Sequence, residues 1–342
     1  MAGLLACVVL AAVARLAGSA LQLGLDTALA LVLGLAVGSI SAVRERLLPG
    51  ASLAARYALR LGITLLGARL TVGQLLATGL GSVVAIVVTV SVALLLGTWL
   101  ARRFGLVPPL SALITVGMAI CGNSAILALS PIIGARPRET AYAVSTITIF
   151  GLIGVLVLPV LGRLLEMSDP AFGTWAGLAV NDTAQVVATG YVYSAPAGDV
   201  ATVVKLTRNL AILPVLLGAS WWAARSLHAA TTATTVDAAP NRSTSGLAMV
   251  ARAVPWFVVG FVVFAALRSL GLLDVVLPTG GTLADLCSTL AAVFILVALA
   301  GVGLATDIRA MLDVGARPFL LGGSMWVVIT LLGLALAQVY HG

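Results

Sequence analysis

The sequence predicts an all-α polytopic membrane protein with inverted structural repeats and two interrupted helices, in about 9–11 membrane segments. Apolar runs of roughly 18–20 residues, the length that an α-helix needs to cross a bilayer, recur along the chain. Hydrophobic residues make up 61% of the 342 residues and charged residues 9%, with a mean hydropathy of +1.15. No soluble domain of this size has that balance. A single transmembrane domain over residues 1–342 is therefore expected.

Eleven apolar segments follow one another along the chain, the first of which lacks the basic start of a signal peptide. They cover about 3–17, 25–41, 52–68, 78–101, 108–134, 139–163, 171–194, 198–224, 250–270, 283–301 and 318–339. Two of them are interrupted by small or polar residues, at Ile120-Cys121-Gly122-Asn123-Ser124 and at Asn181-Asp182-Thr183. The polar stretch 227–249 is predicted to be a flexible loop.

The two interrupted segments resemble each other. Residues 117–128 align without gaps on residues 177–188, with identities at three of the twelve positions. A looser pair joins Leu66–Leu70 to Ala300–Leu304. The order of these units predicts two halves, about 20–165 and about 168–342, of which the second is circularly permuted. Transporters are commonly built from such inverted repeats, with interrupted helices that meet at the membrane midplane.

Inversion requires an odd number of membrane crossings in each repeat. The requirement is met if 108–134 and 171–194 are re-entrant, entering and leaving on the same side. The positive-inside rule favours this arrangement slightly, because it places Arg136 and Arg138 in the cytoplasm and Arg163 outside. Both segments are nevertheless long enough to cross a membrane, so full spans are the alternative.

Two ionisable residues fall where the surrounding sequence predicts membrane depth. They are Asp182 and Lys205, the only lysine in the chain. An ionisable group costs roughly 2.5–3.5 kcal/mol inside a membrane and usually has a function there. Breaks in a helix at this depth also free backbone N–H groups, which attract anions, and carbonyls, which attract cations. A glycine-rich packing contact between helices is the alternative explanation of the breaks.

Lys205 and Arg208 lie three residues apart and therefore share one helix face. Lys205 is predicted to bind an anion or to pair with Asp182, with snorkelling to the interface as the alternative. Arg56 and Arg60 are interpreted as interfacial anchors, with a substrate role as the alternative. The predicted substrate-binding residues lie at the two breaks and on this helix face: Cys121, Gly122, Asn123, Ser124, Asn181, Asp182, Thr183, Gln185, Lys205 and Arg208.

Several other classes of function lack support in the sequence. No nucleophile–base pair, phosphate-binding loop or metal-ligand cluster is recognisable, so neither an enzyme nor a cofactor is expected. The cysteines Cys7, Cys121 and Cys287 have no spacing typical of disulfides or metal sites. The net charge of +7 comes from arginines at helix ends, a membrane pattern, and does not indicate a nucleic-acid partner.

Four stretches resemble the YeiH-like family of bacterial membrane proteins, which are labelled sulfate exporters: Arg60–Thr71, Ile120–Ala125, Ala184–Gly190 and Val204–Arg208. The resemblance covers nearly the whole chain in order. It implies a scaffold domain, a core domain with crossing interrupted helices, a location in the bacterial inner membrane, and membership of the cation:proton antiporter and anion transporter superfamily. Members of the family often carry His-Glu where this chain has Asn181-Asp182, so a proton relay through histidine is not expected here.

Two functions follow as hypotheses. The first is a secondary active transporter for a small anion (a sulfate-like oxyanion, a sulfonate or an organic acid), coupled to H⁺ or Na⁺ through Asp182. Burial favours a protonated carboxyl and a nearby lysine favours the carboxylate, which suits a coupling residue. The second is a Na⁺/H⁺ antiporter that uses Asn181-Asp182. If sodium is the coupling ion, Asn123, Asp182 and Thr183 are its expected ligands. A homodimer is compatible with the sequence, which leaves the oligomeric state open.

Overall fold

The computed structural model describes residues 2–21, 26–219, 256–278, 281–306 and 315–341. This part of the chain is helical and contains no strand; its one β-bridge joins Val276 to Thr282. The all-α fold class predicted from the sequence is thereby confirmed. The predicted loop 227–249 lies outside the described residues, as do the end of the predicted segment 198–224 and the start of 250–270.

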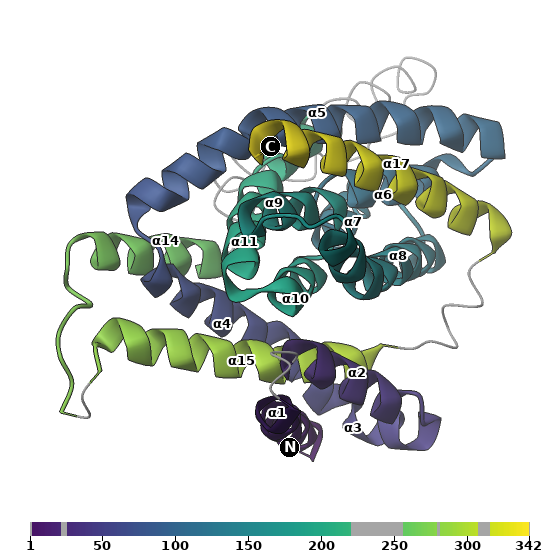
Figure 1. Cartoon of the computed structure of the whole chain (residues 1–342). Helices are drawn as coiled ribbons and strands as arrows, with labels where there is room; N and C mark the ends of the chain where they lie inside the picture. Colours follow the sequence, from purple (N-terminus) through teal and green to yellow (C-terminus); the bar gives the residue numbers. More distant parts are fainter. Residues whose placement is uncertain (1, 22–25, 220–255, 279–280, 307–314, 342) are drawn as a thin grey trace, which may run out of the picture.

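The α-helices run in the order that Figure 1 labels. They are α1 (Ala2–Leu21), α2 (Asp26–Gly38), α3 (Ser41–Leu53), α4 (Leu59–Leu66), α5 (Val72–Phe104), α6 (Pro108–Ala119), α7 (Asn123–Leu129), α8 (Pro137–Leu164), α9 (Asp169–Ala179), α10 (Thr183–Tyr193), α11 (Ala195–Asn209), α14 (Trp256–Ser269), α15 (Leu283–Ala305) and α17 (Ala316–His341). A π-helical turn, η1 (Ala54–Ala58), joins α3 to α4, and a 3₁₀ turn, η2 (Gly67–Arg69), follows α4.

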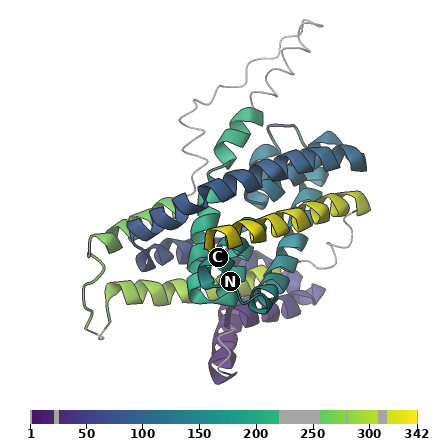
Figure 2. The same ribbon diagram turned by 45° about the horizontal axis from the view of Figure 1, so that its top comes forward.

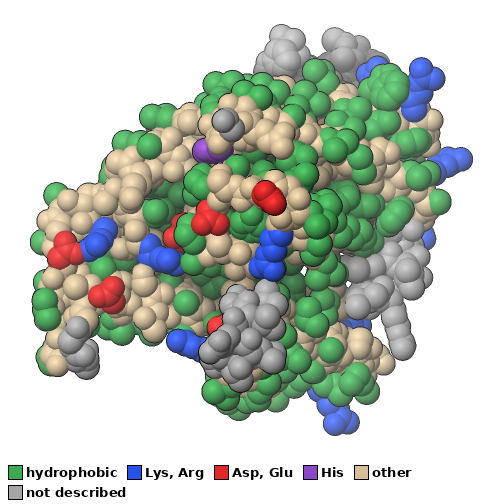
Figure 3. Space-filling model, viewed as in Figure 1, with side chains coloured by type: hydrophobic (Ala, Val, Ile, Leu, Met, Phe, Trp, Pro, Cys, Tyr) green, Lys and Arg blue, Asp and Glu red, His purple; other side chains and the backbone are tan. Residues whose placement is uncertain are grey.

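Five helical segments of the described chain are long and apolar enough to cross a membrane. They are α5, α8, α15, α17 and the stretch Ala195–Ala219, which contains α11. Shorter apolar helices accompany them, among them α2, α6 and α14. Figure 3 shows hydrophobic side chains over much of one face of the molecule, with few charged ones among them. The chain is a multi-pass membrane protein.

The structure differs from the sequence-based boundaries at several places, among them α3 and α5. Helix α3 was not predicted, because its stretch Arg44–Pro49 reads as a charged loop ending in proline; Pro49 nevertheless lies inside the helix. Helix α5 is longer than the predicted segment 78–101 because it has strong signals at both ends. Thr71 forms a capping box with Gln74 at its start, and Gly105, with φ +60°, ends it.

The helices form two groups. The scaffold group comprises α1 to α4, α14 and α15, and the core group comprises α5 to α11 and α17. Figures 1 and 2 both show α5 and α17 side by side along one edge of the core group. Within the scaffold group, α2 and α15 approach very closely through glycines. A Cβ atom on Gly34 would lie 2.3 Å from the carbonyl oxygen of Ala300, so only glycine fits there.

One helix of the core group, α10, packs on the scaffold group. Its residues Ala184, Val187 and Ala188 are buried in the same hydrophobic cluster as Leu31 of α2 and Ala298 of α15. These small and β-branched side chains make an apolar face. Because α10 begins at one of the predicted breaks, this contact between the two groups lies directly beside that break.

Candidate functional site

The chain leaves the helical conformation at both of the predicted interruptions. Helix α6 ends at Ala119 and α7 begins at Asn123, while α9 ends at Ala179 and α10 begins at Thr183. The two breaks touch, since a Cβ atom on Gly122 would lie 3.3 Å from the backbone nitrogen of Asp182. Gly122 has φ +63°, a backbone conformation that is unfavourable for residues other than glycine. Four helix ends therefore meet at one point.

The ends of the α9–α10 segment lie on the same side of the molecule. Ser194, directly after α10, donates a hydrogen bond of 2.6 Å from Oγ to Oδ1 of Asp169, the first residue of α9. The hydroxyl of Tyr193 donates to the carbonyl oxygen of Met167, just before α9. This segment therefore turns back at its break.

Arg208 stabilises the carboxyl ends of both α6 and α9. Its Nη2 donates to the carbonyl oxygens of Met118 at 2.8 Å and Ala119 at 2.9 Å. Its Nη1 donates to the carbonyl oxygen of Leu178 at 2.7 Å. The last carbonyls of a helix have no partner within the helix and carry the negative end of its dipole. A fully buried guanidinium satisfies them here and offsets both negative helix ends.

Lys205 acts on the same two breaks, one helical turn earlier on α11. Its Nζ donates to the carbonyl oxygen of Ile120 at 2.9 Å and to that of Val180 at 3.3 Å, and the side chain is fully buried. No ion pair joins Lys205 to Asp182, both of which lie in the described chain. The predicted shared face of Lys205 and Arg208 is thus used to bind backbone carbonyls.

Asn181 belongs to this buried polar network. Its Oδ1 accepts a hydrogen bond from Nη2 of Arg208 at 3.3 Å, and its Nδ2 donates to the sulfur of Met118 at 3.2 Å. The side chain is fully buried. Asn181 and Asp182 are neighbours in sequence but lie on opposite sides of the break. Asn181 lies on the side of Arg208, called here behind the break, and Asp182 lies on the side of the cavity, called here in front of it.

A cavity of about 490 Å³ lies in front of the breaks, between the scaffold and core groups. Its walls come from α3, η1 and α4, from the starts of α7 and α10, and from α8, α14 and α15. Hydroxyl-bearing residues contribute much of the lining: Ser52, Ser124, Ser145, Thr148, Thr183 and Thr306. The volume is within the range of roughly 300–1,000 Å³ that small-molecule sites occupy.

Helix α10 points its amino end into this cavity. Asp182 caps that end, with Oδ1 accepting a 2.9 Å hydrogen bond from the backbone nitrogen of Ala184, and its other oxygen accepts from Nδ2 of Asn123 at 3.2 Å. Gln185, in the first turn, donates from Nε2 to the carbonyl oxygen of Thr148 at 3.0 Å. The positive end of the α10 dipole therefore faces the cavity, with one carboxylate beside it.

Two buried oxygens at the cavity have no hydrogen-bond partner. They are Oδ1 of Asn123 and Oε1 of Gln185. A buried polar atom left without a partner costs about 1–3 kcal/mol, and most such atoms in proteins are paired. Both oxygens are enclosed by protein; that of Gln185 packs against α8, since a Cβ atom on Gly151 would lie 1.8 Å from it.

Two arginines also line the cavity. Arg56 lies on the π-helical turn η1 and Arg60 on α4. Within the described chain neither has a carboxylate within ion-pair distance; Arg60 lies over the ring of Phe257, 5.9 Å from its centre. This position differs from the favoured sequence-based interpretation of both as interfacial anchors and agrees with the alternative of a substrate role. Their spacing of four residues was the available signal, because it places both on one face of a helix.

The structure divides the predicted substrate-binding residues into two sets. Asn123, Ser124, Asp182, Thr183 and Gln185 line the cavity together, so the three expected sodium ligands are among them. The other set does not line this cavity. Asn181, Lys205 and Arg208 lie behind the breaks, Gly122 forms the turn before α7, and Cys121 lies in the wall of an adjoining smaller cavity. A role in substrate binding stays a prediction for both sets.

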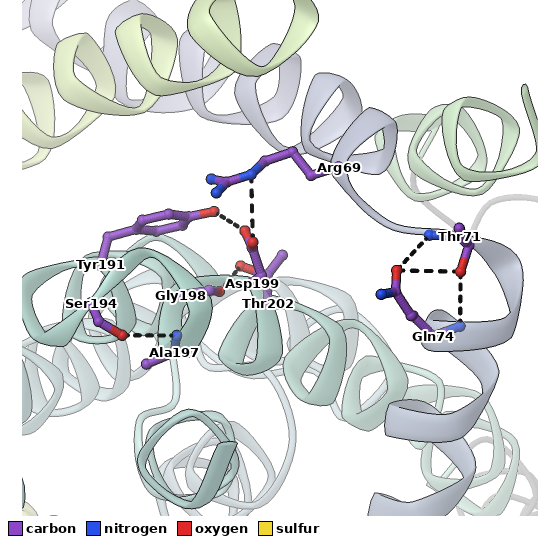
Figure 4. Close-up of polar contacts among 9 residues, drawn as sticks. All are labelled: Arg69, Thr71, Gln74, Tyr191, Ser194, Ala197, Gly198, Asp199 and Thr202. Carbon is purple, nitrogen blue, oxygen red and sulfur yellow. Dashed lines mark hydrogen bonds and ion pairs between the residues drawn. The ribbon is translucent and has the colours of Figure 1, made fainter. Parts of the chain in front are cut away.

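The scaffold and core groups also make a polar contact about two turns of α10 away from the cavity. Figure 4 shows Asp199 of α11 between Arg69 and Tyr191. Its Oδ2 lies 3.5 Å from Nε of Arg69, and its Oδ1 accepts from the hydroxyl of Tyr191. Arg69 belongs to η2 of the scaffold group, whereas Tyr191 and Asp199 belong to the core group. An ion pair thus links the two groups at a distance from the cavity.

Comparisons with known proteins agree with this membrane architecture. The family model described as Conserved hypothetical protein 698 matches residues 2–322. A UPF0324 membrane protein of Streptococcus pyogenes serotype M3 is 34% identical over 338 residues, which cover 98% of this chain and 95% of that protein. A UPF0324 membrane protein of Clostridium tetani is 34% identical over 316 residues, with coverages of 91% and 89%.

A third relative, a UPF0324 membrane protein of Streptococcus agalactiae serotype V, is 30% identical over 343 residues, covering 98% of this chain and 96% of its own. No solved structure matches the chain. The similarity extends over both breaks and over the elements that line the cavity. The chain therefore belongs to the family described as Conserved hypothetical protein 698, together with these UPF0324 membrane proteins.

Proposed function

We propose that this protein is a secondary active transporter that moves a small anion across the bacterial inner membrane, coupled to H⁺ or Na⁺ through Asp182. The anion is a sulfate-like oxyanion, a sulfonate or an organic acid. One observation carries the proposal. Arg56 and Arg60, without carboxylate partners in the described chain, face the same cavity as the amino end of α10.

The capping of α6 and α9 supports an anion rather than a cation as substrate. At each break one half-helix ends and another begins, so negative and positive dipole ends meet. Lys205 and Arg208 satisfy the carbonyls of the negative ends from behind. In the cavity, the positive end of α10 and two guanidiniums attract an anion, and the Asp182 carboxylate is the one charge that opposes it among the described lining residues.

Asp182 supplies a physical means of coupling. Its carboxylate lies in the cavity wall, where it repels a bound anion. A proton or a sodium ion that neutralises Asp182 removes this repulsion, so cation and anion each favour the binding of the other by the same factor. Asn123 and Thr183 line the same cavity as Asp182, and their side chains are the proposed sodium ligands.

A Na⁺/H⁺ antiporter is the second candidate. Asn123, Asp182 and Thr183, whose side chains all carry oxygen atoms, line one cavity, and this favours a cation site. Against it, Asn181 binds Arg208 and Met118 behind the break, so the Asn181-Asp182 pair does not act as one cation site. The resemblance to the YeiH-like family and its superfamily, with a scaffold and a core domain, agrees with either kind of transport.

The experiment is a transport screen in proteoliposomes. Radiolabelled sulfate, sulfite and organic acids are offered against a sodium or a pH gradient, with Arg56→Gln, Arg60→Gln and the double variant beside the wild type. Arg102→Gln is the matched control, since Arg102 lies in the last turn of α5, outside the cavity.

The anion proposal expects the double variant to lose transport and the control to keep it. Transport by the double variant at the wild-type rate would contradict the proposed anion site. Sodium uptake that depends on Asp182 and proceeds without any anion would establish the antiporter instead.

A further inference from the structure

A second, smaller cavity adjoins the first. Its volume is about 100 Å³, and it shares four lining residues with the larger one: Arg60, Ser124, Thr183 and Phe257. Two cavities that share four lining residues are neighbours. The smaller one, called here the apolar arm, extends between α11 of the core group and α14 of the scaffold group.

The wall of the arm differs from that of the main cavity. Apart from the shared residues it is formed mainly by leucine, isoleucine and valine, from Leu206 to Leu213 on one side and Val258 on the other. Cys121 and Asn209 are the polar exceptions among the described residues of this wall. The main cavity, in contrast, carries hydroxyls, two arginines and the amino end of α10. A polar compartment thus adjoins an apolar one.

Arg60 marks the junction, because it lines both compartments. Its guanidinium lies over the ring of Phe257, which also lines both. A charged group bound at Arg60 therefore has polar walls on one side and apolar walls on the other. A bare tetrahedral oxyanion is small and strongly hydrated, and it would leave both the arm and most of the main cavity unfilled.

We infer that the substrate is an amphiphilic organic anion, with a sulfonate or carboxylate head group and a short apolar tail. The head group binds Arg56, Arg60 and the amino end of α10, and the tail lies in the apolar arm. This inference rests on the proposed function and narrows its substrate class. Because each buried methylene contributes about 0.8 kcal/mol, affinity is expected to rise about threefold to fourfold for each methylene that enters the arm.

The test is a binding series on the purified full chain in detergent. The probes are inorganic sulfate, methanesulfonate, ethanesulfonate, propanesulfonate and butanesulfonate at matched ionic strength, and the readout is the concentration that protects the protein from thermal unfolding. Uncharged 1-butanol controls for the tail alone. Apparent affinity should rise with each methylene, and sulfate, methanesulfonate and 1-butanol should bind weakest.

Two variants distinguish binding of the tail in the arm from nonspecific hydrophobic binding elsewhere on the protein. Val258→Phe places a larger side chain in the arm and should remove most of the gain from the tail while leaving methanesulfonate binding unchanged. Val259→Phe is the matched control, because Val259 lines neither cavity and is 52% exposed. It should retain the full dependence on tail length.

The outcomes distinguish this inference from the proposed function. Sulfate binding that is as tight as butanesulfonate binding, and that is lost in Arg60→Gln, overturns the amphiphilic substrate and leaves the anion transporter intact. A tail dependence that Val258→Phe does not change overturns the arm as its site. Absence of protection by every anion in the series overturns both proposals.

Discussion

Nζ of Lys205 donates a hydrogen bond of 2.9 Å to the carbonyl oxygen of Ile120, at the break after α6. The buried ammonium group is thereby bound to the backbone, while Asp182, at the break between α9 and α10, interacts with Asn123 and the amino end of α10. This separation assigns the two charges different tasks. Lys205 stabilises the break, and Asp182 is available to the cavity.

Replacing Lys205 with methionine should lower stability and impair transport only as far as folding is impaired. The change leaves the carbonyls of Ile120 and Val180 without their donor, at a cost of about 1–3 kcal/mol. Thermal unfolding of the purified protein measures it. Arg208→Met should cost more, because Arg208 binds more carbonyls. Normal stability in Lys205→Met together with complete loss of anion binding would instead make Lys205 a direct ligand of the substrate.

Asp182→Asn should uncouple transport. The change is nearly isosteric, but the amide neither takes up a proton nor carries a charge. Accumulation driven by a sodium or pH gradient should vanish, whereas exchange of substrate at equilibrium should partly survive. Glu166→Gln is the control, since Glu166 is an exposed acidic residue between α8 and α9 that lies outside the cavity. Accumulation by Asp182→Asn at the wild-type rate would rule out a coupling role.

Gly122→Ala should destabilise the break between α6 and α7. The residue has φ +63° and ψ −123°, a conformation that costs about 1–3 kcal/mol for a residue other than glycine. The new Cβ atom would also lie 3.3 Å from the backbone nitrogen of Asp182. Gly134→Ala is the matched control, because Gly134 has the same φ but no atom within 4 Å of the new Cβ. Equal losses of melting temperature in both variants would show that the contact with Asp182 has no effect.

Arg69→Gln and Asp199→Asn should each weaken the link between the scaffold and core groups. The Arg69 side chain is 30% exposed, so the ion pair contributes only about 0.2–1 kcal/mol. A double-mutant cycle on thermal unfolding measures the coupling of the two residues. Strict additivity of the two single changes would show that the contact does not stabilise the arrangement. Thr71→Ala, which removes the cap of α5, is the comparison substitution outside the ion pair.

Labelling of single cysteines tests the predicted topology. Cysteines at positions 136 and 163, in a background without Cys7, Cys121 and Cys287, should react with impermeant reagents from opposite faces of the membrane. The expectation of nine spans with two re-entrant segments places position 136 in the cytoplasm. Labelling of position 136 from outside would favour eleven full spans.

The fold class and most helices were predictable because hydrophobic length and helix-end signals are local properties of the sequence. Both breaks were predictable for the same reason, since Gly122 and Asp182 interrupt otherwise continuous apolar runs. Helix α3 was not, because its charges and Pro49 disfavour a helix locally. The two inverted halves and the count of membrane segments stay predictions.

By itself, the sequence determined that the chain is an α-helical membrane protein with polar breaks and a few charges at membrane depth. Only the tertiary structure decided which partners those charges have. Lys205 and Arg208 share a helix face in any α-helix, but their binding to carbonyls of α6 and α9 depends on how three helices pack. Likewise, Arg56 and Arg60 become cavity residues because α4 lies opposite the breaks. Electrostatic roles depend on distances between segments remote in sequence, and no local pattern contains those distances.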